Sequence, residues 1–185
     1  MHISQWLNFR EVDSTNDWIK NNHSNLPVGT CVYTATQRSG RGQGANYWFS
    51  PIGGLYFSVL LEKGPFLIDA KSLVPHFSYH AQKFLNQRYN LNIRFKKPND
   101  LYVENSKLMG VLFDNIFMGN TLCASILGVG LNVNYEFNSN STEVECNAIS
   151  IRQLIGSKFL LDTRKLMVDL LESYEYEELR SGFYE

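Results

Sequence analysis

The stretch T-Q-R-S-G-R-G-Q-G-A-N-Y-W-F-S-P, residues 36–51, has a composition that neither a helix nor a strand favours. It carries Gly40, Gly42 and Gly44, with Arg41 between the first two glycines. Glycines at this spacing reach positive φ angles and let backbone N–H groups approach a ligand closely. Consecutive N–H groups in such turns form a concave anion site, and a guanidinium suits carboxylate or phosphate. The alternative is a flexible glycine loop between two strands.

Two common phosphate-binding motifs do not fit this stretch. A Walker A loop is excluded because no Gly-Lys-Ser/Thr follows the glycines. The dinucleotide motif G-x-G-x-x-G is excluded because Ala45 stands where the third glycine should be.

Three further stretches accompany the glycine loop. They are D-S-T-N-D at residues 13–17, R-F-K-K-P-N-D-L-Y-V-E-N-S-K-L-M-G-V-L-F-D at 94–114, and L-G-V-G-L-N-V-N at 127–134. Read in order, the chain shows Ser-Thr-Asn, Gln-x-x-Gly-Arg-Gly, Trp-x-Ser-Pro, Lys-x-Pro-Asn-Asp, Lys-Leu-x-Gly and Gly-x-Gly-x-Asn. Over about residues 10–134 the set resembles the catalytic domain of biotin protein ligases.

This resemblance implies a fold and an activity. The implied fold is α+β, a mixed or antiparallel sheet packed on a few helices, similar to class II aminoacyl-tRNA synthetases. The implied enzyme activates biotin with ATP to biotinyl-5′-adenylate and transfers biotin to a lysine of a biotin carboxyl carrier protein. The first step brings a carboxylate to a polyphosphate, so catalysis depends mostly on positioning and on well-placed cations.

The resemblance also implies the site residues. The expected biotin site consists of Ser14, Thr15, Gln37, Gly40, Arg41, Lys107, Gly110, Gly128 and Gly130. The expected nucleotide site consists of Arg41, Gln43, Trp48, Asn99, Asp100, Lys107 and Asn132. Arg41 and Lys107 are the expected catalytic residues, and Asp100 is the expected contact for Mg²⁺, which takes few carboxylates together with phosphate oxygens.

Ordinary structural roles compete with several of these assignments. Ser14 and Thr15 suit the start of a helix over residues 15–22. Lys107 could be a solvated lysine beside a hairpin turn, and Asp100 could form an Asx turn after a proline. His76 and His80 are four residues apart, but we interpret them as ordinary histidines of a helix and not as metal ligands.

The remaining pattern predicts the other elements. β-Branched, aromatic and apolar runs predict strands over residues 5–12, 30–36, 55–61, 92–96, 101–103, 107–114 and 121–133. Helical spacing predicts a helix from about residue 73 to 88, with Pro75 in its first turn or at a kink, a short helix from Ser150, and a longer helix from Asp162 or Thr163. Turns are expected at residues 63–66 and 116–120, and a polar loop at 135–147.

Composition bounds the class of protein. The chain has 185 residues, 44% of them hydrophobic, with 17 Lys+Arg against 18 Asp+Glu. This length and composition suit a single catalytic domain over residues 1–185. The chain has no excess of basic residues that would indicate binding to DNA. No signal peptide and no membrane span are expected. The widely spaced Cys31, Cys123 and Cys146 fit a reducing cytoplasm. The sequence leaves the oligomeric state open, including a homodimer.

The chain departs from the family pattern in places. Gln43 and Gly44 replace further loop arginines, and Lys97 replaces a tryptophan. We expect neither the N-terminal DNA-binding domain nor the small C-terminal β domain of other members, and hence no repression of transcription. Two alternatives stay open: a lipoate–protein ligase, and a non-catalytic biotin- or nucleotide-binding module.

Overall fold

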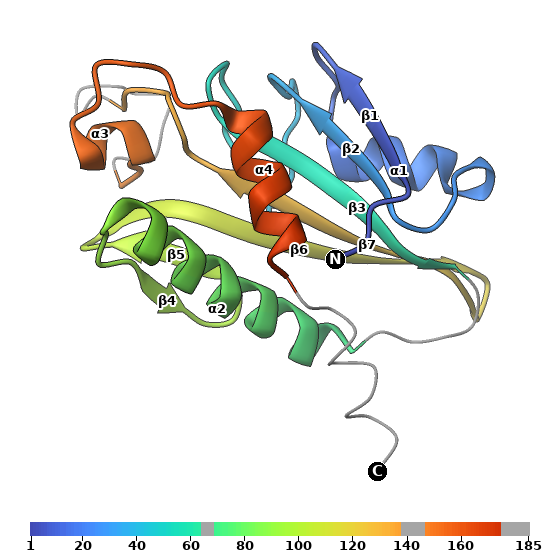
Figure 1. The fold of residues 1–185 in the computed structure, drawn as a ribbon. Helices are drawn as coiled ribbons and strands as arrows, with labels where there is room; N and C mark the ends of the chain where they lie inside the picture. Colours follow the sequence, from blue (N-terminus) through green and yellow to red (C-terminus); the bar gives the residue numbers. More distant parts are fainter. Residues whose placement is uncertain (64–68, 138–146, 175–185) are drawn as a thin grey trace.

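The computed structural model describes residues 1–63, 69–137 and 147–174. Within them, seven strands form one sheet in the order β1-β2-β3-β7-β6-β5-β4 (Figure 1). The strands are β1 (Gln5–Phe9), β2 (Thr30–Thr34), β3 (Leu55–Lys63), β4 (Arg94–Lys96), β5 (Asp100–Val103), β6 (Ser106–Met118) and β7 (Thr121–Leu131). The helices are α1 (Thr15–Asn22), the 3₁₀ turn η1 (His23–Asn25), α2 (Ala70–Tyr89), α3 (Ile151–Ile155) and α4 (Thr163–Glu172). β1 pairs with β2 in parallel and the other neighbours are antiparallel, which confirms the expected α+β fold.

The central strands are buried on both faces, and successive residues alternate between two apolar clusters. Val59 and Leu127 belong to the larger cluster, which also contains residues of α2, α3 and α4. Their neighbours Leu60 and Ile126 belong to a smaller cluster with Ile19 of α1. The sheet therefore carries α2 and α4 on one face and α1 on the other (Figure 1), and the smaller cluster leaves part of the α1 face free for a site.

Capping residues fix where the helices begin. The Ser14 side chain accepts a hydrogen bond from the backbone of Asp17, and Asp162 caps α4 in the same manner. Ser150 forms a reciprocal capping box with Gln153 at the start of α3. These three starts confirm the predicted ones.

Two local predictions were wrong. The turn expected at residues 116–120 is confined to Gly119 and Asn120, because β6 continues to Met118 and pairs with the start of β7. The helix predicted from about residue 73 begins at Ala70, so Pro75 is its sixth residue, beyond the first turn, where it removes the helical donor for the carbonyl four residues earlier.

Two other predictions fall mainly on residues that the structure does not describe. They are the turn at 63–66, apart from Lys63, and most of the polar loop at 135–147. Over the described ranges, no helix is both long enough and apolar enough to cross a membrane.

Candidate active site

A cavity of about 470 Å³ lies on the α1 face of the sheet. Its walls come from the start of α1, the glycine loop and strands β5, β6 and β7. The predicted site residues that line it are Ser14, Thr15, Gln37, Arg41, Gln43, Trp48, Asn99, Asp100, Lys107, Gly110, Gly128, Gly130 and Asn132. Residues as far apart in sequence as Ser14 and Asn132 thus meet at one place.

Glycines form the floor of the cavity. Gly110 of β6 pairs directly with Gly130 of β7, and Gly128 lies two residues away on the same face. A Cβ atom at Gly130 would collide with the indole of Trp48, and one at Gly128 would collide with the amide of Asn16. Glycine is therefore required here by close approach of other side chains, as expected for glycine inside a strand.

The start of α1 supplies hydroxyl and amide groups. Gln37 accepts hydrogen bonds through Oε1 from the Thr15 backbone N–H at 2.9 Å and from Thr15 Oγ1 at 3.3 Å. Its Nε2 donates to Ser50 Oγ at 2.8 Å. Ser58 Oγ, on β3, lies 2.7 Å from Thr15 Oγ1. Ser14 and Thr15 thus form the start of α1 and also line the cavity.

The glycine loop folds back on itself. The Trp48 N–H donates to the carbonyl of Gly40 at 2.8 Å, and the Gly42 N–H donates to that of Asn46 at 2.8 Å. Gly40 is the predicted site residue that does not line the cavity. A Cβ there would meet Ser50 Oγ and Gln37 Nε2, so its small size serves packing within the loop.

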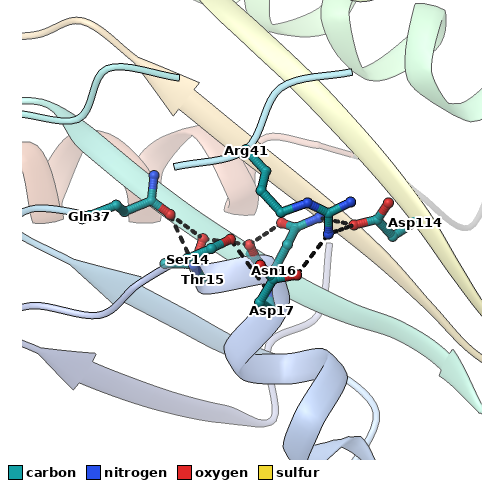
Figure 2. A network of polar contacts seen from close by, with 8 residues as sticks. Ser14, Thr15, Asn16, Asp17, Gln37, Arg41 and Asp114 are labelled. Atoms are coloured by element: carbon teal, nitrogen blue, oxygen red, sulfur yellow. Dashed lines mark hydrogen bonds and ion pairs between the residues drawn. The ribbon is translucent and has the colours of Figure 1, made fainter. Parts of the chain in front are cut away.

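Arg41 is held by two carboxylates (Figure 2). Its Nη1 donates to Asp17 Oδ1 at 2.8 Å and to Asp114 Oδ2 at 3.0 Å. Asn16 Nδ2 donates to the same Asp114 oxygen at 3.0 Å. Burial lowers the pKa of Arg41, but the charges and hydrogen bonds of Asp114 and Asp17 outweigh it and raise that pKa above its usual value. The guanidinium stays charged at every physiological pH.

No role in the site is predicted from the sequence for Asn16, Asp17 or Asp114. Asn16 is the third residue of the Ser-Thr-Asn motif, and Asp114 ends the 94–114 stretch, so both stood inside quoted motifs. Their partners lie far away in sequence, 73 residues in the case of Arg41 and Asp114. Only the folded chain shows them together.

Lys107 lies between a carboxylate and an indole. Its Nζ is 2.8 Å from Asp100 Oδ2 and 5.2 Å from the centroid of the Trp48 ring. Two buried atoms beside it, Trp48 Nε1 and Asp100 Oδ1, have no hydrogen-bond partner among the described residues. Buried polar atoms normally have a hydrogen-bond partner. These two atoms therefore leave hydrogen-bonding capacity unused next to Lys107, the second cation of the cavity.

The two predicted nucleotide-site asparagines also bind the backbone. Asn99 Nδ2 donates to the carbonyl of Val111 at 2.9 Å, and Asn132 Nδ2 donates to that of Lys107 at 3.1 Å. Both residues line the cavity. Their hydrogen bonds also fix β6, the strand that carries Lys107 and Gly110.

The described residues contain no group of three or more metal-ligating side chains. His76 and His80, interpreted as ordinary histidines, lie 3.1 Å and 3.0 Å from the hydroxyls of Tyr174 and Ser173. Asp100 is the one carboxylate among the described residues of the cavity wall, and its Oδ1 has no hydrogen-bond partner among them.

The amino-acid sequence of this chain is similar to those of known biotin–protein ligases. A chloroplastic biotin–protein ligase of Arabidopsis thaliana is 32% identical over 174 residues, which are 89% of this chain and 44% of that protein. The bifunctional ligase/repressor BirA of Escherichia coli is 32% identical over 125 residues, 66% of this chain and 38% of that protein. The chain thus spans less than half the length of these relatives.

The fold is also similar to those of solved biotin protein ligases. A biotin protein ligase from Aquifex aeolicus, determined in complex with biotin and ATP, superimposes with a TM-score of 0.77 at 27% identity. The match covers 92% of this chain and 68% of that one. The model of the biotin/lipoate A/B protein ligase family matches residues 8–132, so the chain belongs to that family.

Proposed function

We propose that the chain activates biotin with ATP to biotinyl-5′-adenylate and then transfers biotin to a lysine of a biotin carboxyl carrier protein. The observation that carries this proposal is the composition of the cavity. Arg41 and Lys107 lie in its wall, and three glycines form its floor. Membership of the family and the names of the relatives support it.

In this proposal the head of biotin binds at the start of α1. Its ureido group can exchange hydrogen bonds with Ser14, Thr15 and Gln37, which line that end of the cavity. The apolar ring system lies over the glycine floor. Trp48 covers Gly110 and Gly130 in the structure, so a bound ligand shares that floor with the indole or displaces it.

The first step joins two anions. An oxygen of the biotin carboxylate attacks the α-phosphorus of ATP, a new O–P bond forms, and pyrophosphate leaves. Lys107 and Arg41 offset the charge that gathers between the two groups, which is the kind of contribution that preorganised donors make. Lys107 must exchange Asp100 for the ligand, because Asp100 Oδ2 lies 2.8 Å from its ammonium.

The second step consumes the mixed anhydride. The neutral amine of the carrier lysine attacks the acyl carbon, an amide bond forms as the nitrogen loses a proton to solvent, and AMP leaves with the electrons of the broken C–O bond. The described cavity offers the ammonium of Lys107 and the guanidinium of Arg41 to the leaving phosphate.

We also propose Asp100 as the contact for the Mg²⁺ that accompanies ATP. The fit rests on one carboxylate oxygen, Oδ1, which has no hydrogen-bond partner among the described residues. Mg²⁺ is commonly held by one or two carboxylates together with phosphate oxygens. Bound there, it would offset the charge of the phosphates.

We propose a reducing cytoplasm as the compartment. The described cysteines, Cys31 and Cys123, are free, and reduced thiols are typical of that compartment. Burial raises the pKa of Cys31, so this thiol stays protonated and unreactive.

Mixing the protein with ATP, Mg²⁺ and either biotin or lipoate tests the proposal against its alternatives. Pyrophosphate release with biotin, followed by labelling of a carrier protein, supports a biotin protein ligase. Release with lipoate alone indicates a lipoate ligase, which the family also contains. Binding of biotin without release indicates a non-catalytic module and contradicts the proposal.

A further inference from the structure

We infer that Asp114 is a positioning residue, which together with Asp17 fixes the guanidinium of Arg41 at the cavity wall, ready for an anionic ligand. Figure 2 shows the arrangement: Arg41 lies between the carboxylates of β6 and α1. The inference rests on the proposed function for the identity of the ligand, and on the geometry alone for the positioning.

The backbone on either side of Arg41 is hydrogen-bonded within the loop, from Trp48 N–H to the Gly40 carbonyl and from Gly42 N–H to the Asn46 carbonyl. These bonds tie the loop to itself and not to β6 or α1. The Arg41 side chain supplies the link to those two elements. The two ion pairs tie the loop to a strand in the middle of the sheet and to the first turn of α1.

The two carboxylates that hold Arg41 lie outside the lining of the cavity. Arg41 and Asn16 line the cavity, whereas Asp17 and Asp114 do not. Among the described residues, Nη1 is the only nitrogen of Arg41 with an acceptor. The Nε–H and Nη2–H groups thus remain for a ligand while Nη1 stays on its two partners.

Asp114 also orients the second residue of this wall. Its Oδ2 accepts from Asn16 Nδ2, while Asn16 Oδ1 is close to Ser58 Oγ. The amide of Asn16 is therefore fixed over Gly128 by partners at both ends. One carboxylate oxygen consequently aligns two cavity residues from different elements.

A positioning role and an inhibitory latch predict opposite effects of neutralising Asp114. If Asp114 preorganises Arg41, its loss makes the guanidinium mobile, and an anion binds more weakly because ordering must then occur on binding. If Asp114 instead withholds Arg41 from the ligand, its loss makes the anion bind more tightly. Neither carboxylate lines the cavity, and this favours the first.

The test compares Asp114→Asn with Asp169→Asn. Both wild-type carboxylates accept from an arginine, at 3.0 Å and 2.7 Å, and their side chains are 22% and 23% exposed, but Asp169 pairs with Arg88 on α2, away from the cavity. Asp17→Asn is a second variant at a more exposed carboxylate, where folding is less sensitive.

The first readout needs no ligand. We expect hydrogen exchange at residues 39–47, and tryptic cleavage after Arg41, to be about 5-fold faster or more in Asp114→Asn, since partly buried ion pairs of this kind are worth roughly a factor of that size. Asp17→Asn changes both in the same direction, and Asp169→Asn leaves both at the wild-type rate. Unchanged loop exchange in Asp114→Asn and Asp17→Asn overturns the inference whether or not the chain binds biotin.

The second readout separates biotin from biotinamide, which lacks the carboxylate. Asp114→Asn should weaken binding of biotin about 5-fold or more and leave binding of biotinamide nearly unchanged. Tighter binding of biotin by Asp114→Asn establishes the latch and overturns positioning. Failure of wild-type protein to bind either compound contradicts the proposed function and leaves the loop readout to decide the positioning.

Discussion

At the scale of single residues, the glycine floor makes a sharp demand on size. Gly130→Ala places a methyl group against the indole of Trp48. Overpacking of this kind costs about 1–3 kcal/mol of the free energy of unfolding. Urea unfolding of Gly130→Ala should show a loss in that range.

A double-mutant cycle identifies the cause of that loss. In a Trp48→Ala background the methyl group at residue 130 meets no indole, so its cost should fall below about 0.5 kcal/mol. An equal cost of Gly130→Ala in both backgrounds would place the strain in the strand itself and not between Gly130 and Trp48.

The motifs predicted the glycines and the two cations of the site, because those residues stand in short, ordered patterns. They could not predict Asp17 or Asp114 as partners of Arg41. The three residues come from a helix, a strand and a loop, and no spacing along the chain links them. Likewise, the sequence could not show that Asn99 and Asn132 also hold backbone carbonyls.

At the scale of elements, the glycine loop should respond to ligands. Residues 38–47 have few apolar anchors, so ordering them fully costs conformational entropy that ligand contacts must offset. Hydrogen exchange across these residues should slow when biotin and ATP are added together. Identical exchange with and without both ligands would show that the loop is not the lid of the site.

Helix α4 offers a test of capping away from the cavity. The Asp162 side chain accepts from the Lys165 backbone N–H at 2.9 Å. Asp162→Ala should therefore cost about 0.5–2 kcal/mol of stability, whereas Asp162→Ser should be close to neutral. Arg164→Ala, an exposed change in the same turn, is the matched control. Equal unfolding midpoints for Asp162→Ala and wild type would refute the cap.

The starts of α1, α3 and α4 could be predicted because capping is local. The start of α2 at Ala70 and the C-terminal end of β6 could not. Ile116, Phe117 and Met118 carry no turn residue, yet the predicted turn began among them. Their place is decided by pairing with β7 across the turn that Gly119 makes at φ +59°. The position of Pro75 inside α2 follows from the start of that helix at Ala70, behind its cap Asp69.

At the scale of the whole molecule, the contact between α2 and the end of α4 makes stability depend on pH. Burial, together with the charge of His76, lowers the pKa of His80 below its usual 6.5. The unfolded chain then binds a proton more readily than the folded chain. Stability should therefore decrease as pH falls through about 6.5 and be regained above it.

Thermal unfolding at pH 7.5 and pH 5.5 checks this sign. Wild-type protein should lose melting temperature at the lower pH, and His80→Gln should lose less because the titrating group is gone. A loss in His80→Gln as large as in wild type would assign the acid sensitivity to other groups.

In the proposed reaction this cavity activates biotin by adenylation, with Lys107 acting mainly in the transition state. Lys107→Met keeps the length and apolar stem of the side chain and removes its charge. Losing one well-placed electrostatic donor typically costs about 10²–10³ in rate, and an interaction made mainly in the transition state lowers rate more than ground-state binding.

The most direct measurement is single-turnover formation of biotinyl-5′-adenylate by wild type and Lys107→Met, beside a biotin binding isotherm for each. Lys165→Met, an exposed lysine on α4, is the control. We predict adenylate in wild type and in the control, and a rate about 10²–10³ lower in Lys107→Met with biotin affinity nearly unchanged. Wild-type protein that forms no adenylate would contradict the proposed adenylation. A Lys107→Met variant that forms adenylate at the wild-type rate would contradict the proposed role of Lys107.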